Sequence, residues 1–110
     1  MQTNAIILAG PRDLGVTQVG LKPPGAQDVV VEVRHSAIST GTEKLFWSGQ
    51  MPPFPGMGYP LVPGYEAAGE IVEAGAESGF SVGETVFVPG GNCYDGAFGL
   101  FGGSARHIVS

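Results

Sequence analysis

The chain has 110 residues, a length typical of one domain with a modest hydrophobic core. Ten acidic and five scattered basic residues give a net charge of −5, which argues against nucleic-acid binding, because that function needs clustered basic charge. The chain has no apolar run of the roughly 20 residues that cross a bilayer and no basic start of a signal peptide. We therefore expect a cytoplasmic protein, with peripheral attachment to a membrane left open.

Cysteine usage and turn-forming residues narrow the fold class further. Cys93 is the only cysteine, so an internal disulfide and a four-cysteine zinc site are both excluded by count. Nineteen glycines and nine prolines indicate many turns, and short runs of Val and Ile lie between them. This pattern favours a mainly β domain, a barrel or a sandwich with long loops.

The N-terminal part of the chain predicts a hairpin. Residues 3–9 form a short apolar run that indicates a strand buried on both faces. Residues 14–21 alternate apolar and polar side chains, with a slip at Thr17 and Gln18 that predicts a bulge. The Pro-Pro-Gly sequence at residues 23–25 interrupts regular structure and ends the second strand.

The strongest strand pattern covers residues 28–38. It places Val29, Val31 and Val33 on one face, which we expect to point into the core. A short helix over residues 43–48 follows, with Thr40 or Thr42 as its cap and Gly49 as its end.

Five prolines between residues 50 and 63 exclude a helix and an inner strand there, so this segment is predicted to be a stiff, shaped loop. A strand over residues 65–74 comes next and begins beside Glu66, whose carboxylate we expect to be buried. The later elements are a turn (81–84), a strand (85–88), a glycine-rich loop (89–103) and a last strand (104–109). A rigid loop that delivers a carboxylate to a strand is typical of a functional site.

The order of these motifs resembles the N-terminal catalytic domain of the medium-chain dehydrogenase/reductase superfamily. The turn at residues 37–43, the helix, the loop, Gly-Tyr-Glu at residues 64–66, the apolar strand and Val-Gly-Glu at residues 82–84 carry the resemblance. It implies a GroES-like, partly open β-barrel with long loops and one or two short helices, formed by residues 1–110.

Within that superfamily, residues 39–66 (STGTEKLFWSGQMPPFPGMGYPLVPGYE) most closely resemble the bacteriochlorophyllide dehydrogenases of bacteriochlorophyll a biosynthesis. The resemblance implies oxidation of the 3-(1-hydroxyethyl) group of a tetrapyrrole substrate to acetyl, with hydride transfer to NAD. It leaves two further points open: a peripheral location at photosynthetic membranes and a homo-oligomer of the full-length enzyme.

Two positions depart from the zinc-dependent members of the superfamily. Ser39 and Tyr65 stand where those members have the cysteine and histidine ligands of the catalytic metal. A hydroxyl and a phenol are poor replacements for thiolate and imidazole on zinc, so we expect no metal.

Alcohol oxidation without a metal requires side chains to accept the proton and to stabilise the oxyanion. Ser39, Thr40, Tyr65 and Glu66 are the candidates that the resemblance implies. Two alternatives stay open: Tyr65 fills the volume of the missing histidine and zinc, and Glu66 ties the backbone together. For Glu43 a capping role alone is favoured.

Aromatic residues of the helix and loops can bind a flat ring by stacking. The candidates for substrate binding are Trp47, Phe54, Tyr59, Phe98 and Phe101. The alternative is that aromatic side chains plug the barrel ends, which is favoured for Phe46 and Trp47.

Other motifs are weak. No complete G-x-G-x-x-G is present, so NAD is expected to bind a Rossmann domain outside these residues, and this chain alone is expected to be inactive. His35, His107 and Cys93 are interpreted as ordinary structural residues. Two other functions remain open: the same domain of a zinc-free quinone or enoyl reductase, and a separate co-chaperonin-like binding module.

Overall fold

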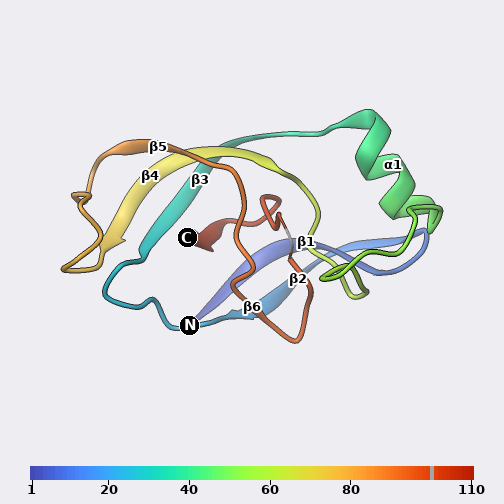
Figure 1. Cartoon of the computed structure of the whole chain (residues 1–110), viewed down its shortest axis with the longest axis horizontal. Helices are drawn as coiled ribbons and strands as arrows, with labels where there is room; N and C mark the ends of the chain where they lie inside the picture. Colours follow the sequence, from blue (N-terminus) through green and yellow to red (C-terminus); the bar gives the residue numbers. More distant parts are fainter. Residues whose placement is uncertain (100) are drawn as a thin grey trace.

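Two antiparallel sheets and one helix make up the computed structural model, which describes residues 1–99 and 101–110 (Figure 1). The first sheet has the order β1 (Gln2–Gly10), β2 (Asp13–Leu21), β6 (Tyr94–Asp95). The second has the order β5 (Thr85–Val88), β4 (Glu66–Ala74), β3 (Val29–Ala37), β7 (His107–Val109). Helix α1 (Thr40–Ser48) connects β3 to the proline-rich loop. The prediction of a mainly β domain with a short helix is confirmed.

Residues 104–106 join the two sheets. On one side Ile6 N–H donates to the Ser104 carbonyl and Arg106 N–H donates to the Asn4 carbonyl, each at 2.9 Å. On the other side Val33 N–H donates to the Arg106 carbonyl at 2.8 Å. Because these bonds link β1 to β3, the sheets form an open barrel rather than separate layers, which fits the expected GroES-like fold.

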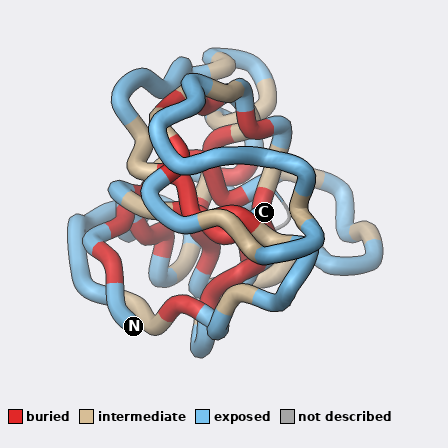
Figure 2. The backbone as a smooth tube through the Cα atoms, turned by 90° about the vertical axis from the view of Figure 1, so that its left-hand side faces the viewer, coloured by how far each residue is buried: buried red, intermediate tan, exposed pale blue. Residues whose placement is uncertain are grey.

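The core lies between the sheets, where the buried parts of the chain meet (Figure 2). Val31, Ile71 and Ile108 are fully shielded from solvent. Burying a side chain of this size contributes about 1.5–3 kcal/mol. A second, smaller cluster of Leu8, Phe46 and Leu61 lies where α1 and the proline-rich loop meet β1.

Two details of the β1–β2 hairpin differ from the predictions. The expected bulge at Thr17 and Gln18 is wrong, because pairing runs unbroken there and shifts instead between Leu8 and Gly10. Burial of β1 on both faces is also wrong: Ile6 is 37% exposed, since only one face of the hairpin meets the core.

Strand β3 also departs from simple alternation. Val29, Val30 and Val31 are all buried, whereas Val33 is only half-buried. The pairing of β3 with β4 shifts between Val30 and Val31, which changes the faces of the following residues. The prediction of one inward-facing row is therefore wrong at Val30 and Val33.

The other predicted elements hold with shifted ends. Strand β5 has the predicted bounds, and β4 begins one residue later than predicted. The glycine-rich loop over residues 89–103 contains the unpredicted β6, and the last strand is limited to β7. The loop over residues 50–63 contains no helix and no extended strand, as predicted.

Candidate active site

Helix α1 presents its N-terminal end to the loop that leads into β4. It begins at Thr40, three residues earlier than predicted, with Ser39 as the N-cap residue. Neither Thr40 nor Thr42 caps it, because the Glu43 carboxylate accepts the Ser39 N–H at 2.7 Å. Gly49 ends the helix at φ 77°, as predicted for a residue without a Cβ. The capping role favoured for Glu43 is confirmed.

The carboxyl group of Glu43 also has a raised pKa. Burial raises its pKa, and repulsion from Glu66 raises it further. Hydrogen bonds from the Ser39 and Gly64 N–H groups oppose that rise. Glu43 therefore links the start of α1 electrostatically to the start of β4.

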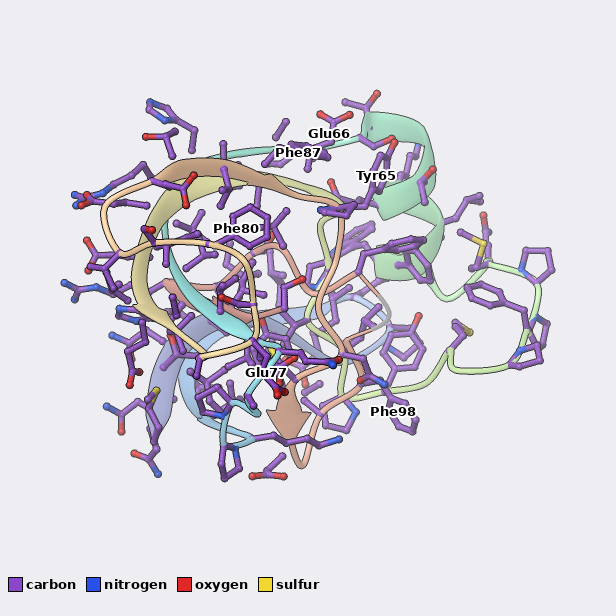
Figure 3. The ribbon with its side chains drawn as sticks, turned by 60° about the vertical axis from the view of Figure 1, so that its left-hand side comes forward. Tyr65, Glu66, Glu77, Phe80, Phe87 and Phe98 are labelled. Atoms are coloured by element: carbon purple, nitrogen blue, oxygen red, sulfur yellow. The ribbon has the colours of Figure 1, made fainter. Side chains whose placement is uncertain are left out.

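Glu66 is exposed, so the prediction of a buried carboxylate at this position is wrong. Side chains alternate along β4, and Ala67 takes the inward position. Tyr65 is half-buried, and its ring packs edge-on against Phe101 with centroids 5.6 Å apart. Figure 3 shows Tyr65 and Glu66 beside α1.

A cavity of about 360 Å³ lies between α1 and the β1–β2 hairpin. We call it the α1 groove. Its walls are almost wholly apolar, and the charged side chains on it are Glu43 and Lys44. The residues that line it are Ile6, Leu8, Leu14, Ile38, Thr40, Glu43, Lys44, Trp47, Pro63 and Ser104.

Two of the predicted site residues, Thr40 and Trp47, line the α1 groove. Trp47 is 41% exposed, and the Arg12 guanidinium lies 5.6 Å from its ring centroid. The interpretation of Trp47 as a plug is therefore wrong. That interpretation is confirmed for Phe46, which is buried in the smaller core cluster.

The remaining predicted aromatics lie elsewhere. Phe54 packs edge-on against Phe46, and the Tyr59 hydroxyl donates to the Phe46 carbonyl. Phe98 is 45% exposed and lies well away from Tyr65 in Figure 3. The structure therefore does not gather the five predicted substrate-binding aromatics into one surface.

The donor groups do not fit a catalytic zinc ion. Ser39 offers a hydroxyl and Tyr65 a phenol on a ring packed against Phe101, and neither is a ligand that zinc prefers. Among residues 1–99 and 101–110, no three His, Cys, Asp or Glu side chains gather closely enough to hold a metal.

The other residues interpreted as structural lie outside the α1 groove. Cys93 is a buried free thiol that accepts the Val109 N–H at 3.4 Å, and burial raises its pKa. His107 Nε2 lies 3.5 Å from Glu32, and His35 is exposed on β3. The structural interpretation of Cys93 is confirmed.

Sequence reasoning missed most of the groove. Glu43 was recognisable from the Ser-x-x-x-Glu spacing at the helix start, but its place on the groove wall was not. Ile6, Leu14 and Ile38 come from separate strands and connections and carry no shared sequence signal. Among the described residues, the structure has no helix that is long and apolar enough to cross a membrane.

Comparison with known proteins places these features in a family. The 2-desacetyl-2-hydroxyethyl bacteriochlorophyllide A dehydrogenase of Cereibacter sphaeroides is 59% identical over 115 aligned positions, covering all of this chain and 36% of that protein. The protein of the same name from Rhodobacter capsulatus is 54% identical over an alignment that covers all of this chain and 35% of that protein. This chain thus spans about a third of the length of these curated relatives.

A solved structure and a family description agree with these relatives. A probable oxidoreductase from Mycobacterium abscessus superposes with a TM-score of 0.74 at 28% identity, over all of this chain and 33% of that one. The description of the alcohol dehydrogenase GroES-like domain matches residues 25–109. The chain belongs to the family of alcohol dehydrogenase GroES-like domains.

Proposed function

We propose that this chain is the substrate-side domain of a dehydrogenase that oxidises the 3-(1-hydroxyethyl) group of a bacteriochlorophyllide to acetyl. The observation that carries the proposal is 59% identity, over the whole chain, to a protein named for that activity. The apolar α1 groove supports it, since an apolar wall suits the face of a tetrapyrrole ring.

In this proposal the reaction proceeds without zinc. NAD would bind to a domain outside these residues and would supply the hydride acceptor. Tyr65, as the phenolate, accepts the hydroxyl proton and becomes the neutral phenol, and the Ser39 and Thr40 hydroxyls donate hydrogen bonds to the developing oxyanion. The negative charge of Glu66 adds to the effect of burial on Glu43: both raise the pKa of the Glu43 carboxyl and so favour its protonated form. Trp47 offers a ring surface on the wall of the α1 groove, and Phe101 offers one beside Tyr65.

The test is an absorbance assay of the full-length protein with NAD and 2-desacetyl-2-hydroxyethyl bacteriochlorophyllide. We expect NADH to form in equal amount to the acetyl product, and none to form with the 110-residue domain alone. The already oxidised acetyl compound is the negative control.

Failure has a clear signature. Reduction of quinones or enoyl compounds by the full-length protein, without oxidation of the hydroxyethyl substrate, would replace this function with that of a zinc-free reductase. Turnover by the isolated domain would show that NAD binds within residues 1–110.

A further inference from the structure

A second hollow, of about 280 Å³, adjoins the α1 groove. It shares Ile6 and Ser104 with the groove, so the two form one continuous surface. Its wall carries Arg34, His35 and Arg106, and we call it the basic recess. The whole chain has only five Lys and Arg residues and a net charge of −5. Two arginines at one hollow are therefore a local concentration of positive charge in an acidic chain.

The two arginines differ in their partners. Arg34 contacts the Glu32 carboxylate at 3.1 Å and the Glu70 carboxylate at 3.3 Å, so its charge is already compensated. Arg106 makes no ion pair with any residue that the structure describes. Its backbone is fixed on both sides, by hydrogen bonds to Asn4 and Val33, while its side chain is exposed. The backbone of Arg106 is therefore held in place, and its positively charged side chain is accessible to a ligand.

The α1 groove, at the other end of the surface, carries charged side chains of both signs. At the α1 groove Glu43 is accompanied by Lys44, and Glu66 lies close enough to Glu43 to repel it. A ligand carboxylate is therefore attracted by Arg106 at the basic recess, whereas at the α1 groove the positive charge of Lys44 is offset by Glu43.

We propose that Arg106 binds the carboxylate of the tetrapyrrole substrate in the basic recess, while the ring lies in the α1 groove. This inference rests on the proposed function, since a bacteriochlorophyllide is a flat apolar ring that bears a free carboxylic acid side chain. Arg106 is then a specificity-determining residue: it selects the free acid over an esterified ring, and it sets which end of the ring points to Ser39 and Thr40.

The experiment compares 2-desacetyl-2-hydroxyethyl bacteriochlorophyllide with its methyl ester, using the full-length protein and its Arg106→Gln, Arg106→Lys and Lys22→Gln variants. Kd is measured from the change in ring absorbance, and KM and kcat from NADH formation. One charge-assisted hydrogen bond corresponds to about a tenfold difference in affinity. We expect Arg106→Gln to raise Kd and KM for the acid about tenfold, with little change in kcat or in affinity for the ester.

Two control variants separate the carboxylate anchor, which is the binding of the substrate carboxylate by Arg106, from general effects of charge and stability. Arg106→Lys keeps the charge and should recover part of the preference for the acid. Lys22→Gln removes one positive charge outside both hollows and should leave that preference unchanged.

The outcomes distinguish the two proposals. Equal Kd values of the unmodified protein for acid and ester, or an equal loss of both in Arg106→Gln, would overturn the carboxylate anchor. Binding that prefers the acid, without NADH formation from either compound, would support the anchor and overturn the proposed dehydrogenase activity.

Discussion

At the scale of single residues, substitution of Tyr65 separates a chemical role of its hydroxyl from a packing role of its ring. Its ring packs against Phe101, and Tyr65→Phe keeps that contact while removing the hydroxyl. If the hydroxyl transfers the proton, kcat of the full-length enzyme should fall by about 10²–10⁴ with KM nearly unchanged. Steady-state kinetics measure both values.

Tyr59→Phe is the matched control for Tyr65→Phe. The Tyr59 hydroxyl donates to the Phe46 carbonyl at the smaller core cluster. Its loss should lower the free energy of unfolding by about 1 kcal/mol and leave kcat unchanged. An unaltered kcat in Tyr65→Phe would leave Tyr65 with packing alone.

Glu43 makes a prediction about pH. Burial and Glu66 hold its pKa above the ordinary value of 4.5, so folding disfavours the ionised carboxylate. The stability contributed by the protonated carboxyl is complete below pH 4.5 and is lost as the pH rises through the folded pKa. Glu43→Gln keeps an oxygen for the Ser39 N–H, so its stability relative to the unmodified chain should increase from pH 4.5 to pH 7.

Urea unfolding of the 110-residue chain at several pH values measures this difference. Glu77→Gln, an exposed carboxylate well separated from Glu66 in Figure 3, reports the general effect of removing one negative charge. A relative stability of Glu43→Gln that stays constant or falls with pH would contradict the raised pKa.

At the scale of elements, two glycines have opposite roles in α1: Gly41 lies within the helix, and Gly49 is the residue that caps its C-terminal end. Gly41 lies in the helix with open space around an added Cβ, so Gly41→Ala should stabilise the domain by about 0.5–1 kcal/mol. Gly49 has φ 77°, and an added Cβ would lie 2.8 Å from Pro11 Cγ. Gly49→Ala should therefore cost about 1–3 kcal/mol.

Thermal unfolding of the two variants side by side checks these signs. Each replaces one glycine with alanine at one end of the same helix, so each serves as the other's control. Stabilisation by Gly49→Ala would contradict the role of Gly49 as the helix end, and destabilisation by Gly41→Ala would contradict the open space around Gly41.

At the scale of the whole molecule, the donor set predicts an enzyme that works without zinc. Dialysis of the full-length protein against a strong zinc chelator should leave kcat and KM unchanged, because neither Ser39 nor Tyr65 offers a zinc ligand. Metal analysis of the purified protein accompanies the assay. Activity that is lost on chelation and restored by zinc would contradict this prediction.

Much of the fold was predictable because local signals were strong. Alternation and turn residues located β2, β4 and β5 to within a residue, and the five prolines excluded a helix from residues 50–63. Bulges were not predictable, since the shift at Val30 and Val31 depends on pairing with β4. Nor was the two-residue β6, which exists only because β2 lies beside it.

The candidate site was predictable only in part. Thr40 was a candidate from the resemblance and Trp47 a candidate for ring stacking, although a plugging role was favoured for Trp47, and both line the α1 groove. Phe54 and Tyr59 instead pack around Phe46, a contact that a list of aromatic residues could not reveal. Exposure of Glu66 follows from the strand's orientation, because Ala67 takes the inward position.

The sequence by itself determined the family, the β class, the stiff loop and the absence of zinc-type ligands at positions 39 and 65, because residue types and local spacing carry that information. Only the tertiary structure decided that the β1–β2 hairpin and α1 enclose an apolar groove. It alone placed Arg106, which has no ion-pair partner among residues 1–99 and 101–110, at one end of that surface and Glu43 at the other. The physical reason is that a surface built from distant segments depends on strand pairing and packing, which no local pattern records.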